Sequence, residues 1–473
     1  MQFLQQVLIY ISTFLLTLTP APEFVEGVVG QPRSFLPSQT VTQHDKTISS
    51  LIYRGLFEYD IYGTLVPNLA ETWEISEDGM VYKIKIKDNQ YWSDGSKITS
   101  NDLIYSAYTS PDLNEVATDK VDDLTVMYTL PNKFSPFLSL LTTMVMQEGS
   151  EDAGHELDPV SSGQFRVVRV ERNGPVVKQI TLWNNDQEQE IRKLVFRYYA
   201  NEEEVITAAN LGEIEGFIGT RQYKLENFDE YKYPLQGVHY SLYFNLRNDK
   251  FADVELRQKL EKVLPVEDLI LPYGIFVEGP ISRSVFTERD IEFNKYDKTF
   301  KGTLPGVSFT ITVPDVNEHV ELVKQIEQIW ESKLGITVDI KKVDPTVFYD
   351  EVIKDYNYEV LFYGQEVGRD PDRYVSWHST QKEGTGLNLS GFSHVRADRA
   401  LEEGRNEVDN NNRIVHYTEF QKVLTEQVPA IFLYHPYTRY YINKFITGVG
   451  DKYTFSLKDR FMDFSNWKTV KTL

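Results

Sequence analysis

Residues 51–106 read LIYRGLFEYDIYGTLVPNLAETWEISEDGMVYKIKIKDNQYWSDGSKITSNDLIYS. Within this stretch, residues 81–87 (VYKIKIK) alternate apolar and polar side chains, which is the two-residue period of a half-buried strand. Asp78-Gly79 before this run and Asp94-Gly95 after it are typical of tight turns between strands. The stretch therefore predicts a small antiparallel β unit.

Short motifs in the same stretch follow a fixed order. They are Tyr53-x-Gly55-Leu56, Gly63-x-Leu65-x-Pro67-x-Leu69-Ala70-Glu71-x-Trp73, Asp78-Gly79 and Trp92-Ser93-Asp94-Gly95-x-x-Ile98-Thr99-x-x-Asp102. No single dipeptide among them is diagnostic. The ordered set resembles the extracytoplasmic solute-binding proteins of family 5, which serve peptide and nickel ABC importers and include oligopeptide- and dipeptide-binding proteins. The resemblance extends over most of the chain, from residue 26 to residue 448.

The length of the chain and the resemblance together define the expected architecture. The chain has 473 residues, more than one hydrophobic core usually supports, and this favours two or three lobes. The resemblance implies an α/β fold of the periplasmic-binding-protein type (cluster C), with two hinged α/β lobes and a small additional β-rich lobe. We expect lobe I from residues 23–50, 160–264 and 432–473, the accessory lobe from residues 51–159 and lobe II from residues 265–431.

Charge and composition exclude several classes of function. The formal net charge is −21, from 70 acids and 49 bases, whereas nucleic-acid binding needs clustered Lys and Arg. The absence of cysteine excludes thiol catalysis, disulfides, Cys-ligated zinc and iron–sulfur clusters. The eight histidines form no His-Glu-x-x-His motif and no close pair. The sequence therefore supports neither a metal site nor a cofactor.

The first residues of the chain are strongly apolar. Residues 3–22 carry no charged side chain, and the first basic residue is Arg33, so neither the positive region of a signal peptide nor a cytoplasmic flank is visible. An uncleaved membrane anchor and a signal peptide both fit this pattern, and a core helix ended by Pro20 and Pro22 is a third interpretation. We favour an anchor over residues 1–22, because no small-x-small cleavage site stands out and no cysteine is available for lipidation.

The middle of the chain predicts a βαβ unit. Residues 193–199 and 215–218 alternate as strands, and the segment between them has the pattern of a helix. Asn201 is typical of a helix N-cap, residues 202–204 supply an acidic first turn, and Gly212 is typical of a C-cap.

The clearest α/β pattern belongs to the expected lobe II, which we expect the chain to enter near residues 263–268. Strands are predicted at residues 307–313, 336–340 and 358–363, with helices over 320–334 and 345–356. Repeated β-α-β units of this kind predict a largely parallel sheet. Residues 398–420 then have the pattern of one polar helix, and residues 428–436 resemble the strand by which the family returns to its first lobe.

The best candidate for a binding site follows the third of these strands. Ligands of parallel α/β sheets bind beyond the carboxyl ends of the strands, which here means residues 364–372 and the Trp377 that follows them. Acids, an arginine and an aromatic residue in one place can hold both ends of a zwitterionic peptide. The candidate ligand-binding residues are Tyr363, Gln365, Glu366, Arg369, Asp370, Asp372 and Trp377.

Several of these candidates have structural alternatives. In peptide-binding family members an aspartate four residues before the loop proline pairs with the amino terminus of the ligand, but here that position is Val367, next to Glu366. Asp370 and Asp372 can instead form a turn in which they accept backbone N–H groups. Trp377 can line a cleft or lie in the core. Arg369 can meet a ligand carboxylate or pair with a neighbouring acid.

The resemblance implies an extracytoplasmic receptor of an ABC importer. Such a receptor captures an extended peptide in the cleft between its lobes and delivers it to a permease and ATPase complex. We expect it to be a monomer that the N-terminal segment holds at the plasma membrane. The alternative from another class is a surface glycan-binding or glycan-active protein, which the 13% aromatic content allows.

Enzymatic functions have little support in the sequence. A glycosidase needs two carboxylates facing each other across a cleft, and 70 acids make such pairs inevitable by coincidence. Neither a Gly-x-Ser-x-Gly elbow nor a phosphate-binding glycine loop is present. We therefore assign no catalytic residue and expect a binding protein rather than an enzyme.

Overall fold

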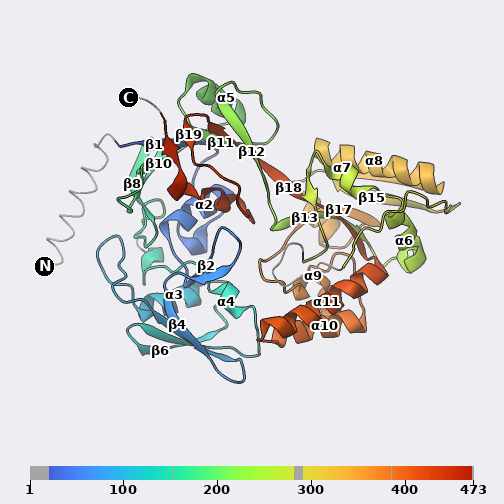
Figure 1. Ribbon diagram of the computed structural model, residues 1–473, viewed down its shortest axis with the longest axis horizontal. Helices are drawn as coiled ribbons and strands as arrows, with labels where there is room; N and C mark the ends of the chain where they lie inside the picture. Colours follow the sequence, from blue (N-terminus) through green and yellow to red (C-terminus); the bar gives the residue numbers. More distant parts are fainter. Residues whose placement is uncertain (1–20, 153, 282–290, 385, 471–473) are drawn as a thin grey trace. The chain divides into compact units, whose positions relative to one another are not determined.

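The computed structural model describes residues 21–152, 154–281, 291–384 and 386–470, which form two compact units (Figure 1). Unit 1 contains residues 21–133, 137–233 and 438–470, and unit 2 contains residues 134–136 and 234–437. The predicted anchor lies outside the described residues except for Ala21 and Pro22. Within the described part, every helix is too short or too polar to cross a membrane.

A mixed sheet forms the centre of unit 1. The first strand, β1, pairs in parallel with β10 on one side and with β11 on the other, while β9 and β8 extend the sheet in antiparallel fashion. The strand β18 runs from unit 2 into unit 1, where it pairs with β11 and β12. The strands of this sheet are β1 (Glu23–Val29), β8 (Phe165–Asn173), β9 (Val176–Asn184), β10 (Lys193–Tyr199), β11 (Gly216–Gly219), β12 (Phe228–Pro234) and β18 (Ala430–Asn443).

The predicted βαβ unit is confirmed. Helix α5 (Glu202–Leu211) connects β10 to β11, and both strands flank β1. The Asn201 side chain accepts a hydrogen bond from the backbone N–H of Glu204 at the start of the helix. Gly212 ends the helix with φ 71°, a left-handed conformation that glycine adopts without steric cost.

Residues 51–106 and the two strands that follow them form the predicted antiparallel unit. A four-stranded sheet in the order β4-β5-β7-β6 is built around β5, whose side chains alternate between buried and exposed. Trp92 is buried and its Nε1 donates to Asp102 Oδ2 at 3.3 Å, so this tryptophan has a structural role. The elements are α2 (Gln43–Ile52), β2 (Phe57–Tyr59), β3 (Leu65–Pro67), β4 (Ala70–Ile75), β5 (Val81–Ile86), α3 (Ser100–Thr109), β6 (Ala117–Asp122), β7 (Thr125–Thr129) and α4 (Phe137–Leu140).

A charged pair is buried inside unit 1. Arg460 Nη2 lies 2.6 Å from Glu26 Oε1, and the side chains are only 2% and 1% exposed. Glu26 also accepts a 2.6 Å hydrogen bond from the Tyr440 hydroxyl. The pair joins β1 to the C-terminal part of the chain, which also contains the short strands β19 (Ile446–Thr447) and β20 (Lys468–Thr469). Burial of two charges is tolerable here because each finds its partner.

The sheet of unit 2 is mixed, so the predicted largely parallel sheet is only partly right. Strands β16, β15 and β17 are parallel, as the β-α-β pattern predicted. Strands β13, β18 and β14 are antiparallel to their neighbours, because they lie outside the β-α-β repeat of residues 307–363 on which the parallel prediction rested. The strands are β13 (Val238–Phe244), β14 (Gly274–Phe276), β15 (Ser308–Pro314), β16 (Thr337–Val343) and β17 (Val360–Glu366).

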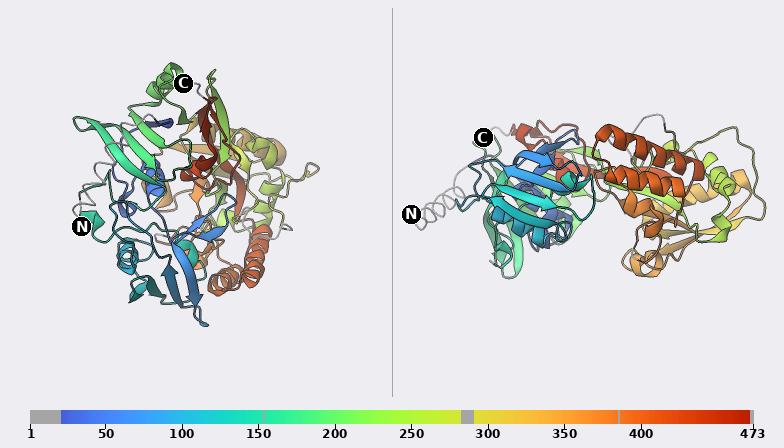
Figure 2. Two further views of the ribbon diagram at one scale, coloured as in Figure 1. Left: turned by 60° about the vertical axis from the view of Figure 1, so that its left-hand side comes forward. Right: turned by 90° about the horizontal axis from the view of Figure 1, so that it is seen from below.

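Two hydrophobic cores cover the two faces of this sheet. On one face, residues of α6, α7 and α8 pack against β15 and β17, with Trp330 fully buried. On the other face, residues of α10 and α11 surround Trp377 and Phe432. Figure 1 shows α8 and the α10–α11 pair on opposite sides of β13 and β17, and Figure 2 shows α10 and α11 side by side. The helices are α6 (Val254–Lys262), α7 (Val266–Ile270), α8 (Asn317–Leu334), α9 (Tyr374–Trp377), α10 (Val395–Asn406) and α11 (Asn410–Gln427).

Two helix predictions need correction in unit 2. The single helix predicted over residues 398–420 is two helices, because Asp409 starts α11 by accepting the backbone N–H groups of Asn411 and Asn412. The helix predicted over residues 345–356 is reduced to a short π-helix at Tyr349–Ile353. Unit 2 begins at residue 234, and β13 and α6 pack in its core.

Candidate functional site

The candidate segment begins within a strand rather than in a loop. β17 continues to Glu366, which pairs with Val238 of β13, and the backbone N–H of Val367 donates to Gly237 O at 2.9 Å. Gly364, Gln365 and Glu366 are therefore strand residues, and the predicted loop start at residue 364 is corrected to residue 367. The strand extends to Glu366 because it pairs with β13, and the sequence of β17 alone does not reveal this pairing.

The side chains of the last strand residues alternate in burial. Gln365 points into unit 2, where its Oε1 accepts from the Tyr243 hydroxyl at 3.2 Å and its Nε2 donates to Leu387 O at 3.0 Å. Tyr363 is half-buried and stacks on Phe348, with ring centroids 5.6 Å apart. Glu366 is exposed to solvent. Only Tyr363 and Glu366 of this strand end can therefore reach a ligand without rearrangement.

His239 lies across the sheet from Gln365 and is fully buried. Burial lowers its pKa well below the ordinary value, and the nearby charges of His435 and Arg373 lower it further. Its Nδ1 lies 3.1 Å from the Ser241 hydroxyl. His239 is therefore neutral at physiological pH and does not supply a charge to the candidate segment.

After Glu366 the chain makes a sharp turn that we call the elbow, residues 370–373. Asp370 Oδ1 accepts the backbone N–H of Asp372 at 2.9 Å, and Asp372 Oδ1 accepts that of Tyr374 at 3.0 Å. The turn predicted as the structural alternative for these acids is therefore present. Arg373 is buried inside the elbow and donates to Asp370 O at 2.6 Å and Pro280 O at 2.7 Å.

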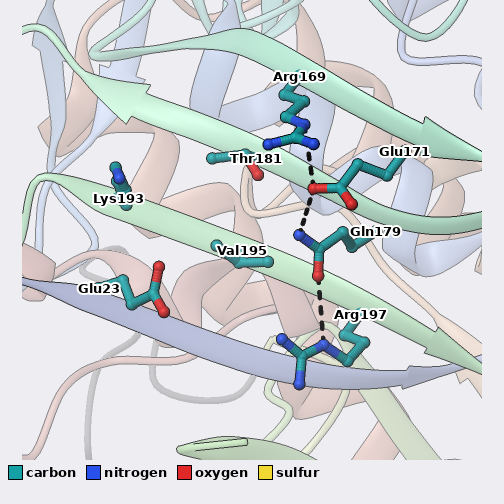
Figure 3. Close-up of a pocket in the computed structure, with 8 residues that line it drawn as sticks. All are labelled: Glu23, Arg169, Glu171, Gln179, Thr181, Lys193, Val195 and Arg197. Atoms are coloured by element: carbon teal, nitrogen blue, oxygen red, sulfur yellow. Dashed lines mark hydrogen bonds and ion pairs between the residues drawn. The ribbon is translucent and has the colours of Figure 1, made fainter. Parts of the chain in front are cut away.

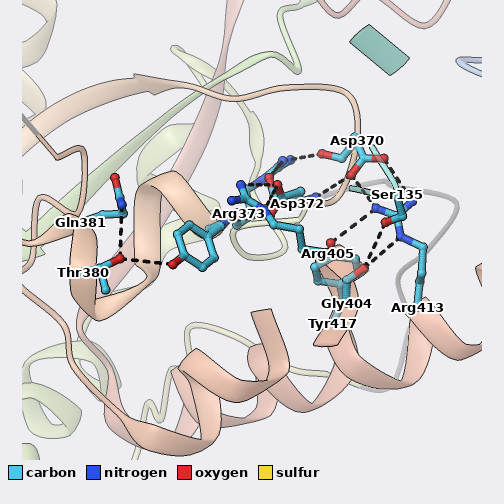
Figure 4. Close-up of polar contacts among 11 residues, drawn as sticks. Ser135, Asp370, Asp372, Arg373, Thr380, Gln381, Gly404, Arg405, Arg413 and Tyr417 are labelled. Atoms are coloured by element: carbon cyan, nitrogen blue, oxygen red, sulfur yellow. Dashed lines mark hydrogen bonds and ion pairs between the residues drawn. The ribbon is translucent and has the colours of Figure 1, made fainter. Parts of the chain in front are cut away.

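Two arginines that we did not predict as site residues bind the elbow acids (Figure 4). Arg413 Nη2 lies 2.7 Å from Asp370 Oδ1, and Arg405 Nη2 lies 2.6 Å from Asp372 Oδ2. Both carboxylates are largely buried with their partners, so neither is free to bind a ligand ammonium group. The pattern of residues 398–420 contains both arginines, but nothing local to that pattern indicates which acids they contact.

Trp377 lies in the core rather than on a surface. It is 1% exposed and packs against Tyr243, Phe392 and Phe432. The C=O groups of Trp377 and His378 accept hydrogen bonds from the buried side chain of Asn388. Trp377 therefore supports the elbow from within the core. Of the two positions that the sequence allowed, lining a cleft or lying in the core, the structure shows the second.

The burial of Trp377 gives a direct prediction. Trp377→Phe should lower the free energy of unfolding by about 1 to 3 kcal/mol, because a smaller ring leaves a cavity in a packed core. Urea unfolding followed by circular dichroism measures this loss. Trp73→Phe is the matched control, because Trp73 is 39% exposed and its replacement should cost much less. Equal losses for the two variants would contradict the packing role.

A second concave region lies on the sheet of unit 1, where strands β8, β9, β10 and β1 present charged side chains (Figure 3). Arg169 Nε lies 3.1 Å from Glu171 Oε1, which also accepts from Gln179 Nε2 at 2.7 Å. Arg197 Nε donates in turn to Gln179 Oε1 at 3.3 Å. These side chains satisfy one another across the sheet, so we assign the region no ligand.

The described residues also bear on metal binding. Nowhere among them do three or more His, Asp or Glu side chains gather in a way that could hold a metal ion. The side chains that can bind a ligand at the end of β17 are therefore the exposed carboxylate of Glu366 and the partly exposed Tyr363 and Arg369. This set can bind charged and polar groups of an organic ligand.

Residues 64–270 match the family model of the bacterial extracellular solute-binding proteins, family 5. The resemblance to family 5 is confirmed. The family 5 match includes most of the stretch from which the resemblance was first inferred.

A curated relative and two solved structures are similar to this chain over most of its length. The oligopeptide-binding protein AppA of Bacillus subtilis is 22% identical, over 88% of this chain and 86% of its own. The structure of that protein in complex with a nonapeptide has a TM-score of 0.69 at 19% identity, covering 96% of this chain and 100% of that one. CtaP of Listeria monocytogenes, an ABC transporter substrate-binding protein, reaches 0.80 at 20% identity with the same coverages. The fold is therefore the α/β fold of the periplasmic peptide-binding proteins.

Proposed function

We propose that this chain is the substrate-binding receptor of an ABC importer and that its ligand is an extended peptide. The observation that carries the proposal is the match to AppA along 88% of the chain, together with the peptide complex of the same relative. Neither AppA nor CtaP is named for a glycan. We therefore set the glycan alternative aside and propose a non-enzymatic function, as in the family.

The proposal includes the setting in which the receptor acts. We propose that it works outside the cytoplasm as a monomer, is tethered by residues 1–22, and delivers peptides to a permease and ATPase complex. We also keep the three-lobe division as a proposal, with residues 51–159 as an accessory lobe. A membrane-fraction blot tests the tether, because a freely soluble mature form shortened at its start would contradict it.

Peptide binding is tested by identifying what the protein retains. The full chain, purified in mild detergent, is incubated with a tryptic casein digest and with mixed oligosaccharides, and the retained molecules are identified by mass spectrometry. We expect peptides of several sequences, since backbone hydrogen bonds to an extended ligand tolerate different side chains. Retention of oligosaccharides without peptides, or release of cleaved products, would refute the proposal.

Within the site we propose that Tyr363, Glu366 and Arg369 contact the peptide, while Gln365, Asp370, Asp372 and Trp377 support them from behind. Glu366 supports this assignment best, because it is an exposed carboxylate at the carboxyl end of β17 and belongs to none of the ion pairs among the described residues. It can accept a charge-assisted hydrogen bond from the amino terminus of the peptide.

Glu366→Gln should weaken peptide binding by about tenfold to a hundredfold, because a hydrogen bond to a charged group contributes roughly 1.5 to 3 kcal/mol. Calorimetric titration with a retained peptide measures the loss. Acetylation of the peptide amino terminus should cause the same loss in the wild type and no further loss in Glu366→Gln. Glu351→Gln, at another exposed carboxylate of unit 2, is the control and should bind like the wild type. Equal sensitivity of Glu366→Gln and the wild type to acetylation would contradict the assignment.

A further inference from the structure

The two arginines at the elbow are the starting point for an inference that rests on the proposed function. Arg405 lies in the last turn of α10, and both its Nε and its Nη2 donate to Asp372 Oδ2, at 2.9 and 2.6 Å. Arg413 lies in the first turns of α11 and makes a two-pronged pair with Asp370, at 2.7 and 3.1 Å. Forked contacts of this kind fix direction as well as distance.

Each bound carboxylate also holds the backbone of the elbow. The same Asp370 side chain that binds Arg413 accepts the N–H of Asp372, and the same Asp372 side chain that binds Arg405 accepts the N–H of Tyr374. The side chains of Arg413 and Arg405 are 4% and 24% exposed, so water competes weakly for these contacts. The arginines therefore fix the orientation of the carboxylates, and the carboxylates fix the elbow.

An aromatic stack strengthens the contact on the Arg405 side. The Arg405 guanidinium carbon lies 4.1 Å from the centroid of the Tyr374 ring, and the His378 ring stacks on the same tyrosine at 4.0 Å. His378 Nε2 lies 3.2 Å from Glu402 Oε1. Glu402 belongs to α10, so this contact connects the stacked rings to that helix. Helix α9, which follows the elbow, is thus held to α10 by a stacked ring as well as by an ion pair.

The pairing of α10 with α11 places both guanidinium groups on the same side. Gly404 packs closely on Tyr417, because a Cβ at this glycine would lie 2.9 Å from the tyrosine ring. The Gly404 carbonyl accepts from Arg413 Nε at 3.3 Å and from the Ser135 hydroxyl at 3.2 Å. Figure 4 shows Arg405 and Arg413 reaching the elbow from these neighbouring helices.

The ligand-facing residues lie between two fixed points. On one side Glu366 pairs with Val238 of β13 and the Val367 N–H donates to Gly237 O, and on the other Asp370 is bound to Arg413. Gly368 lies between them, and a glycine here leaves the bridge flexible unless both ends are held. We propose that Arg405 and Arg413 are positioning residues, which touch no ligand but hold the elbow so that Glu366 and Arg369 face the peptide in one arrangement.

Pre-ordering of a contact segment affects mainly the dissociation of the ligand. Arg405→Gln and Arg413→Gln should therefore each speed peptide dissociation by about tenfold, with a smaller change in association. Casein-digest peptides bound to the full chain are diluted, and the bound fraction is followed by rapid ultrafiltration and mass spectrometry. Arg399→Gln is the matched control, because Arg399 lies on the same helix, is 76% exposed and pairs only with Glu403 among the described residues. It should behave like the wild type.

A variant cycle separates positioning from a general loss of stability. If Arg405 acts through Asp372, Asp372→Asn alone should reproduce its effect, and the double variant should add nothing further. Hydrogen exchange of the Tyr374 amide should quicken in each of these variants at unchanged global protection, and Arg405→Lys should restore part of the slow dissociation. Faster exchange at Tyr374 with wild-type peptide dissociation would overturn the inference. Failure of the wild type itself to retain any peptide would instead refute the proposed function on which it rests.

Discussion

Arg460→Met is expected to lower the free energy of unfolding by about 3 to 5 kcal/mol, since the substitution leaves the buried Glu26 carboxylate without its countercharge. Arg460 donates to both oxygens of Glu26, at 2.6 and 3.2 Å, and also to Leu457 O at 2.6 Å. The side chains of both partners are almost completely buried, so water cannot replace the lost contacts. Urea unfolding followed by circular dichroism measures the loss.

Two further variants show whether the loss arises from the unpaired charge. The double variant Glu26→Gln with Arg460→Met should recover part of the stability, because a neutral amide can still accept from Tyr440 without burying a charge. Arg396→Met should cost less than about 1 kcal/mol, since Arg396 pairs with Glu419 and Glu426 at the surface. A double variant less stable than Arg460→Met would show that the charge of Glu26 is not the cause.

The second large effect concerns Glu261 and depends on pH. Burial raises the pKa of Glu261 to about 7, although the backbone N–H of Asn294 and the charges of Lys295 and Lys262 oppose the shift. The folded protein therefore holds a proton that the unfolded chain has lost between about pH 4.5 and pH 7. Stability from this group is complete below about pH 4.5 and is lost as the pH rises through 7.

Glu261→Gln should therefore raise the free energy of unfolding by roughly 3 kcal/mol at pH 8 and by almost nothing at pH 4.5. Glutamine keeps the acceptor for the Asn294 N–H, which lies 3.2 Å from Glu261 Oε1. Urea unfolding at the two pH values gives the difference. Glu255→Gln, at the exposed end of the same helix, should be nearly neutral at both. A gain for Glu261→Gln that is equal at pH 4.5 and pH 8 would contradict the expected titration.

Many of the elements could be predicted from the sequence because their signals are local. The alternation of residues 81–87 predicts β5, and Asn201 with Gly212 predicts the ends of α5. The apolar spacing before Gly335 likewise predicts α8, which ends at Leu334. In each case the deciding interactions lie within one helical turn or between adjacent residues.

The sequence could predict a candidate site at the end of β17, but not the contacts that its residues make. Glu366 is exposed at the carboxyl end of the third predicted strand, and ligands of parallel α/β sheets bind beyond such strand ends. The partners of Asp370 and Asp372 lie 43 and 33 positions further along the chain, so no local pattern could pair them. The same holds for Gln365, whose burial follows from contacts with Tyr243 and Leu387.

The sequence by itself determined the resemblance to family 5, the α/β class and the segment in which we propose that a ligand binds. Only the tertiary structure decided that Trp377 is a core residue, that β17 runs on to Glu366 and that two arginines occupy the elbow acids. The physical reason is that helix caps, turns and periodicity are fixed by neighbours in the chain. Burial and the choice of a charge partner depend on segments that meet only when the chain folds.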